Sequence, residues 1–163
     1  MRVAASVRAA LLAVVLIAAT AVPLRAEIDV KTFDPRKPMA EFALKDHKGR
    51  AFGLAELQGK WSLIVLGYTH CPDVCPFTLN NLALVNEQIK SQLAPDSLPQ
   101  VVFVGVDPDR DAEILPGYVP HFDPDFLGVT GDWAEIKTLV ETLEGFVRID
   151  KKSDGDEGYP VRH

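Results

Sequence analysis

The chain has 163 residues, which predicts one domain, and its 47% hydrophobic and 25% charged residues are typical of a globular protein rather than a disordered one. A formal net charge of −6 repels nucleic-acid phosphates and argues against a role with DNA or RNA. The two cysteines, Cys71 and Cys75, are too close in sequence for a bridge between them to restrain much of the unfolded chain, so a structural disulfide framework is excluded.

Residues 1–26 have the features of a secretory signal in the expected order. Arg2 and Arg8 give a basic start, residues 9–19 form an apolar run, and small residues near 19–26 offer cleavage sites. The run is shorter than the roughly 20 apolar residues of a membrane span, so we expect cleavage, with an uncleaved N-terminal anchor as the alternative. Either outcome places the protein outside the cytoplasm, in the periplasm or anchored to the membrane facing it. Residues 27–40 are polar and predict a linker before a domain over 41–163.

Hydrophobic periodicity and turn residues predict the elements of this domain. In chain order they are a hairpin over 41–53, one helical turn over 54–59, a strand buried on both faces over 62–68, a loop over 69–75, a helix over 77–93, a second buried strand over 101–106, a short helix over 111–121, a turn over 128–132, a helix over 133–143 capped by Asp132, and two strands over 146–149 and 159–162. This order predicts a layered α/β domain with at least one parallel crossover.

Cys71 and Cys75 lie where the first buried strand is followed by a helix, which is where the sites of such domains gather. A proline follows each cysteine, and because proline is tolerated in the first turn of a helix, Pro76 places Cys75 at the helix start. The free amides of a helix N-terminus favour a thiolate. Residues four apart project to the same side of a helical turn, so the two sulfurs can bind a soft metal or close a redox disulfide.

Three interpretations of this pair are open. Inert packing of buried cysteines fits poorly with the prolines, the loop position and export. A thiol–disulfide oxidoreductase usually has two residues between its cysteines, whereas this chain has three. Structural zinc prefers four protein ligands, so two cysteines with one further donor suit copper better, as Cu(I) or Cu(II).

The third ligand would be one of four histidines, and their pattern alone does not choose among them. His47 lies in the predicted hairpin turn and is expected in solvent. His70 directly precedes Cys71 and is expected to tune or shield the site. His121 is expected near a helix end at the surface, and His163 ends the last strand-like segment.

The cysteine segment resembles the signature of the Sco/SenC copper proteins of cytochrome c oxidase assembly. The matching segment is Gly67-Tyr68-Thr69-His70-Cys71-Pro72-Asp73-Val74-Cys75-Pro76. Further segments agree in order, and these are Gly59-Lys60-Trp61, Val106-Asp107-Pro108-Asp109-Arg110-Asp111 and Gly128-Val129-Thr130-Gly131. The resemblance covers residues 42–163, and the long cysteine segment makes it far more specific than two cysteines at this spacing would be.

The resemblance implies a thioredoxin-like fold and a copper site made of Cys71, Cys75 and a distant histidine. In the family this histidine ends a Tyr-x-Val-Asp-His segment, so the segment Tyr159-Pro160-Val161-Arg162-His163 makes His163 the third ligand by position. Arg162 replaces the usual aspartate, and a cation there disfavours bound copper somewhat, although solvent screens it. Three acidic residues are expected to support the site rather than to bind the metal, namely Asp73, Asp107 and Asp111.

Family members continue beyond the position of His163 with further strands and a final helix. We therefore expect a C-terminally incomplete domain, either as a fragment of a longer gene product or as a poorly stable protein that binds copper weakly through a frayed end.

The implied function is that of a copper chaperone, not an enzyme. It would receive copper outside the cytoplasm and deliver it to a cytochrome c oxidase subunit or to another chaperone. The alternative is a thiol–disulfide reductase that keeps the copper-ligand cysteines of the target reduced.

Overall fold

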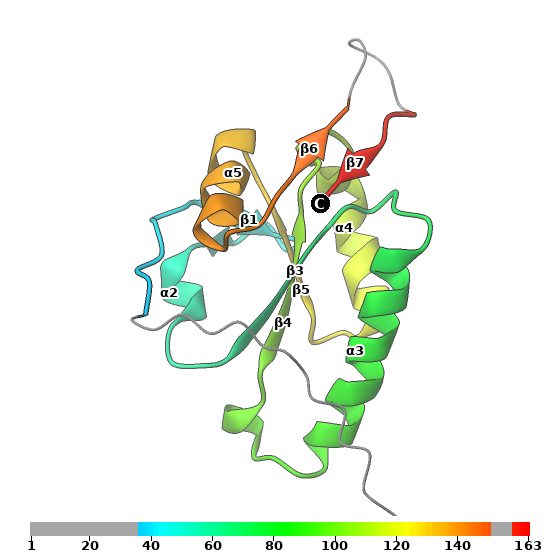
Figure 1. Ribbon diagram of the computed structural model, residues 1–163. Helices are drawn as coiled ribbons and strands as arrows, with labels where there is room; N and C mark the ends of the chain where they lie inside the picture. The colour runs from blue at the N-terminus through cyan, green and yellow to red at the C-terminus, as the bar shows by residue number, and fades with distance from the viewer. Residues whose placement is uncertain (1–35, 151–157) are drawn as a thin grey trace, which may run out of the picture. The chain divides into compact units, whose positions relative to one another are not determined.

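The computed structural model describes residues 36–150 and 158–163, and residues 38–163 form one compact unit (Figure 1). The predicted signal segment 1–26 and most of the linker 27–40 lie outside the described residues. The elements, in chain order, are β1 (Leu44–Asp46), β2 (Ala51–Phe52), α2 (Leu54–Leu57), β3 (Ser62–Gly67), α3 (Val74–Lys90), the 3-10 helix η1 (Pro95–Ser97), β4 (Gln100–Gly105), α4 (Pro108–Phe122), β5 (Leu127–Thr130), α5 (Trp133–Thr142), β6 (Arg148–Ile149) and β7 (Val161–Arg162). Within these ranges we find no helix whose length and hydropathy would let it span a membrane.

Five strands form a mixed sheet in the order β2-β1-β5-β4-β3, which confirms the predicted α/β class. Strands β3, β4 and β5 are parallel, with α3 and α4 as the two crossover connections, and β1 pairs antiparallel with β5 and β2. Gly67 is paired with Gly105 in the register of β3 and β4. The two strands therefore end at the same level, and the loops that follow them meet at one edge of the sheet.

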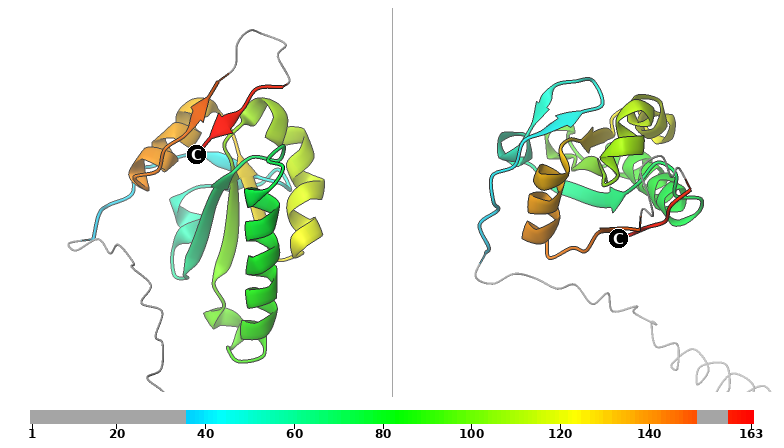
Figure 2. Two further views of the ribbon diagram at one scale, coloured as in Figure 1. Left: turned by 45° about the vertical axis from the view of Figure 1, so that its right-hand side comes forward. Right: turned by 90° about the horizontal axis from the view of Figure 1, so that it is seen from above.

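Helices cover both faces of the sheet, as the side chains of β4 show, because successive side chains of this strand point to opposite faces. Val101 and Phe103 pack with apolar residues of α3 and α4, whereas Val102 and Val104 pack with residues of α5 on the opposite face. Figures 1 and 2 show α3 and α4 on one side of the sheet and α5 on the other. Residues 101–104 are at most 3% exposed, so the continuous apolar run of this strand reflects burial on both faces.

The largest error of the sequence-based prediction is the turn expected over 128–132, because Leu127–Thr130 is strand β5 in the interior of the sheet. The glycine that suggested a turn serves close packing instead. A Cβ atom on Gly128 would lie 2.8 Å from the side chain of Val119 and 3.0 Å from that of Leu115, both on α4. Glycine is therefore needed here so that the helix can approach the strand.

Two helices begin earlier than predicted. Helix α4 begins at Pro108 rather than Asp111, with proline in its favoured first position. Helix α3 begins at Val74, so that Pro76 lies in its first turn. Asp132 does occupy the position before α5, but its side chain makes no capping hydrogen bond.

His47 does not project into solvent as expected. Its backbone amide donates to the carbonyl of Gly128 (2.7 Å), and its Nδ1 accepts a hydrogen bond from the amide of Gly128 (3.0 Å). The imidazole thus joins the end of β1 to β5 and has a structural role.

A buried polar cluster joins α3 to the end of α4. The carboxylate of Asp123 accepts hydrogen bonds from Asn86 (2.8 Å) and from Lys90 (3.4 Å), and both donors lie on α3. Burial opposes ionisation of Asp123, but the amide of Asp125 and these two side chains lower its pKa below 3.8.

We expect Asp123→Asn to lower the free energy of unfolding at pH 7 by about 2 kcal/mol, because it weakens charge-assisted hydrogen bonds at a buried position. The folded-state pKa of Asp123 lies below the unfolded value, so its contribution is full above pH 3.8 and is lost as the pH falls through the folded pKa. Denaturant unfolding of both proteins from pH 7 to pH 3 should therefore show a difference that narrows below about pH 4. A difference that stays constant with pH would contradict this assignment.

Candidate metal centre

The two cysteines lie at the edge of the sheet where β3 and β4 end. The amide of Cys71 donates to the carbonyl of Tyr68 (3.1 Å), which closes a turn directly after β3. Cys75 lies in the first turn of α3, and its amide donates to the sulfur of Cys71 (3.4 Å). A Cβ atom on Gly67 would lie 3.0 Å from the sulfur of Cys75, so glycine at the end of β3 leaves room for that sulfur. The loop and the helix start therefore hold both sulfurs on one side of a single turn.

Cys71, Cys75 and His163 form a group of three possible metal ligands. One donor atom from each lies within 4.8 Å of the others, and the sulfur of Cys75 is 3.7 Å from Nε2 of His163. Metal–sulfur and metal–nitrogen bonds of about 2.0–2.3 Å place donors of one shared ion roughly 4 Å apart, so the three atoms fit a single trigonal ion. Both cysteines are free thiols. Cys71 is 9% exposed and Cys75 is 2% exposed, whereas His163 is exposed, so the histidine side is the open side of the centre.

The pKa values of the two thiols are shifted in opposite directions. Burial alone would raise the pKa of Cys71, but the backbone amides of residues 73–75 donate to its sulfur and lower that pKa below 9.0. Burial raises the pKa of Cys75 to about 12, against a hydrogen bond from the amide of Tyr68 and with the neighbouring sulfur of Cys71 adding to the rise. Cys71 is therefore the first thiolate, and a cation must displace the proton of Cys75 to gain the second.

Partial burial of the imidazole lowers the pKa of His163 below 6.5. The ring is therefore neutral at physiological pH, which is the form that binds metals. Its edge contacts the ring of Tyr68, with centroids 5.8 Å apart at an interplanar angle of 79°. This contact and the sulfur of Cys75 restrict the orientation of the ring from two sides.

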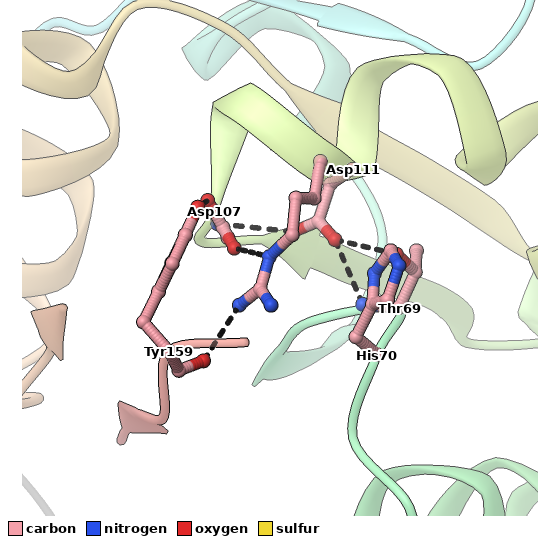
Figure 3. A network of polar contacts seen from close by, with 6 residues as sticks. Thr69, His70, Asp107, Asp111 and Tyr159 are labelled. Carbon is pink, nitrogen blue, oxygen red and sulfur yellow. Dashed lines mark hydrogen bonds and ion pairs between the residues drawn. The ribbon is translucent and has the colours of Figure 1, made fainter. Parts of the chain in front are cut away.

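Asp111 joins the cysteine loop to helix α4. It is fully buried, and its carboxylate accepts hydrogen bonds from the amide of Thr69 (2.7 Å), the hydroxyl of Thr69 (2.8 Å) and the amide of Asp107 (3.0 Å), as Figure 3 shows. Burial raises its pKa above 3.8, although these donors act in the opposite direction. Thr69 precedes Cys71 by two residues, so this carboxylate fixes the start of the cysteine loop.

Asp107 and Asp73, the other two acids expected to support the site, have different surroundings. The carboxylate of Asp107 is 1% exposed and accepts from Nε of Arg110 (2.5 Å) and from the hydroxyl of Tyr159 (2.8 Å). Asp73 is exposed and occupies the position before α3, where its carbonyl accepts from the amide of Phe77 but its side chain makes no capping hydrogen bond. None of the three aspartates belongs to the group of possible ligands found among the described residues.

The remaining histidines lie outside the group. Nδ1 of His70 is 3.2 Å from the hydroxyl of Thr69, and this side chain is exposed at the rim of the cysteine loop. His121 is exposed in the last turn of α4, where its ring contacts Phe122. Arg110 and Tyr159, by contrast, contribute to the surroundings of the centre, although neither is among the site residues predicted from the sequence. A signal was present, because both lie in segments that carry the family resemblance.

A model of the SCO1/SenC family matches residues 31–163. The chain belongs to the SCO1/SenC family. An SCO2-like protein of Rickettsia felis is 37% identical over 142 residues, which cover 86% of this chain and 67% of that protein. The human mitochondrial protein SCO2 homolog is 38% identical over 126 residues, or 76% of this chain and 46% of the human protein. The chain thus spans about two thirds of the first relative and under half of the second.

Solved structures of family members resemble this SCO1/SenC chain closely. Yeast Sco1 with copper bound has a TM-score of 0.70 at 31% identity, covering 77% of this chain and 70% of the yeast chain. Arabidopsis thaliana ScoI with copper bound has a TM-score of 0.66 at 33% identity, covering 77% and 76%. These matches confirm the expected thioredoxin-like fold, in which helices cover both faces of a mixed sheet.

Proposed function

We propose that this protein is a copper carrier and that Cys71, Cys75 and His163 bind the metal. The observation that carries the proposal is the convergence of these three donors in a chain whose structural relatives hold copper. Two thiolates and one neutral imidazole are soft to intermediate ligands that suit Cu(I), and a three-donor set also accommodates Cu(II). Structural zinc would need a fourth protein ligand, and the group found in the described residues has three members.

The acidities of the donors give an order to metal uptake. Cys71 is the more acidic thiol and loses its proton first, Cys75 then gives up its proton, and His163 binds as neutral imidazole. Release follows the reverse order by ligand exchange, since one sulfur can leave while the other still holds the ion. Because His163 is the exposed ligand, an acceptor can approach from its side. Oxidation of Cys71 and Cys75 to a disulfide would remove both sulfur ligands and make loading depend on redox state.

The recipient that we propose is a cytochrome c oxidase subunit during assembly, reached directly or through another copper chaperone. Family membership supports this role. The signal-like residues 1–26 support export to the periplasm, with membrane association through an uncleaved N-terminus as the alternative.

A transfer experiment tests this proposal. The reduced protein loaded with one Cu(I) is mixed with the metal-free copper domain of an oxidase subunit, and both proteins are separated and assayed for copper. Copper should move to the acceptor, and the double variant Cys71→Ser/Cys75→Ser should carry none. Equal copper loading of the wild type and the double variant would contradict the proposal.

A thiol–disulfide reductase is the second candidate, and the unequal thiols favour it. A thiol of lowered pKa at Cys71 beside a protonated, buried Cys75 is the arrangement of an attacking and a resolving cysteine. Reduction of the oxidised acceptor in the absence of copper distinguishes the two candidates. A reductase would keep its rate in His163→Ala, whereas a copper carrier should lose affinity in that variant.

A further inference from the structure

The first turn of α4 is bonded to the loop that carries the cysteines. The carboxylate of Asp111 accepts hydrogen bonds from both the amide and the hydroxyl of Thr69, and it also accepts one from the amide of Asp107. Asp111 is 0% exposed and Asp107 is 1% exposed, so water does not compete for these hydrogen bonds. The turn that begins at Asp107 is therefore fixed relative to the cysteine loop.

The same turn is bonded to the segment that ends at His163. The guanidinium of Arg110 pairs with the carboxylate of Asp107, donates to the carbonyl of Tyr159 (3.2 Å) and stacks on the ring of Tyr159 at 3.8 Å from its centroid. The hydroxyl of Tyr159 donates to the other oxygen of Asp107 (2.8 Å). Figure 3 shows Asp107 and Tyr159 on the side of the network opposite Thr69. Tyr159 is thus held at its backbone, its ring and its hydroxyl.

Sheet pairing does not provide an equivalent alignment. Strands β6 and β7 pair only with each other among the described residues, so no backbone ladder connects β7 to the five-stranded sheet. Val161 packs into the main core, but apolar packing is not directional. The hydrogen bonds of Tyr159, four residues before His163, are directional. They fix both the position and the orientation of this segment relative to α4.

We propose that Arg110 is a positioning residue for the third ligand: it joins Asp107 to Tyr159 and thereby sets the distance between the imidazole of His163 and the two sulfurs. The guanidinium also lies 5.7 Å from the centroid of Tyr68, whose ring contacts His163. Arg110 therefore contacts two aromatic rings, that of Tyr159 and that of Tyr68. This inference deepens the proposed copper function and rests on it.

A double-mutant cycle tests the proposal with Cu(I) and a competing colorimetric Cu(I) chelator. Arg110→Met keeps the length of the side chain and removes its charge and donors. We expect it to lower Cu(I) affinity roughly 10- to 100-fold, as the loss of partners outside the ligand shell typically does, and by about as much as His163→Ala. In the double variant the second change should add less than about twofold, because both variants lose the same ligand. Additive losses, or an unchanged affinity in Arg110→Met, would overturn the proposal.

Arg50→Met is the matched control. Arg50 also pairs with a buried aspartate, Asp46 (2.6 Å), but it does so in the β1–β2 hairpin far along the chain from the ligands. Arg50→Met should leave Cu(I) affinity unchanged within about twofold. If Arg110→Met acted only through a general loss of stability, Arg50→Met would weaken Cu(I) binding as well. Tyr159→Phe provides a milder variant that keeps the ring and removes the hydroxyl that donates to Asp107, and it should lower Cu(I) affinity a few-fold.

Amide hydrogen exchange of the metal-free protein tests the same idea without copper. Arg110→Met should exchange the amides of Val161 and Arg162 about tenfold faster than the wild type, with little change in β4, because only the local anchor is lost. Unchanged exchange in this segment would overturn the proposal, and a wild type that binds no Cu(I) would overturn the proposed function separately.

Discussion

Replacing Cys75 with serine is expected to lower the affinity for Cu(I) by more than about a hundredfold. It removes one of the two thiolates, which are the softest donors of the proposed site, and this loss should exceed the roughly 10- to 100-fold effect expected for the imidazole and for residues outside the ligand shell. Cys75 is 2% exposed, and its sulfur lies 3.7 Å from Nε2 of His163. The group of possible ligands found in the described residues contains no third sulfur that could replace it. A serine hydroxyl is hard and does not ionise at neutral pH, which makes it a poor ligand for Cu(I). Competition titration with a Cu(I) chelator gives the change directly.

Val74→Ser is the matched control for Cys75→Ser. It introduces the same side chain in the same turn of α3, but the side chain of Val74 is apolar, and this residue is 57% exposed. The substitution therefore removes no atom that could bind copper and keeps the backbone amide. The Cu(I) affinity of Val74→Ser should remain within about threefold of the wild type. Substitutions of exposed residues that make no buried contact usually change the free energy of unfolding by roughly 0.5 kcal/mol or less. Similar affinities for Cys75→Ser and Val74→Ser would contradict the assignment of Cys75 as a ligand.

Replacing Asp111 with alanine is expected to lower the free energy of unfolding by about 4 kcal/mol. The change removes the acceptor of three hydrogen bonds at a fully buried position, from Thr69 twice and from Asp107 once. Two backbone amides then lose their partner, and a buried unsatisfied donor costs roughly 1–3 kcal/mol. Chemical denaturation followed by circular dichroism measures this loss.

Glu113→Ala serves as the control for Asp111→Ala, because it removes an acidic side chain from the same helix α4 at an exposed position. It should cost less than about 1 kcal/mol, since most surface substitutions change stability by roughly 0.5 kcal/mol. Asp111→Asn keeps one acceptor oxygen and should fall between the two. Equal stability of Asp111→Ala and Glu113→Ala would show that the buried network contributes little.

The cysteine half of the centre could be predicted from the residues because its determinants are local. Cys71 and Cys75 are close in sequence, and the proline after Cys75 indicates a helix start, which the structure has at Val74. The helix amides that lower the pKa of Cys71 follow from the same local feature.

The histidine half could not be derived in this way, because His163 is 88 residues from Cys75 in sequence. The approach of His163 to Cys75 depends on tertiary contacts, namely the pairing of β6 with β7 and the contacts of Tyr159 with α4. The family resemblance supplied His163, whereas the residue pattern left four histidines open. Strand β5 was missed for a related reason, since Gly128 is required by the approach of α4 and not by a turn.

The proposed function requires that one copper ion be bound by two sulfurs and one imidazole nitrogen. X-ray absorption at the copper edge of the reduced protein, loaded with one equivalent of Cu(I), tests this most directly. We expect a three-coordinate ion with two sulfur neighbours at about 2.2–2.3 Å and one nitrogen neighbour at about 2.0 Å, by analogy with the bond lengths of these ligands to zinc. A shell of nitrogen or oxygen neighbours without sulfur would contradict it.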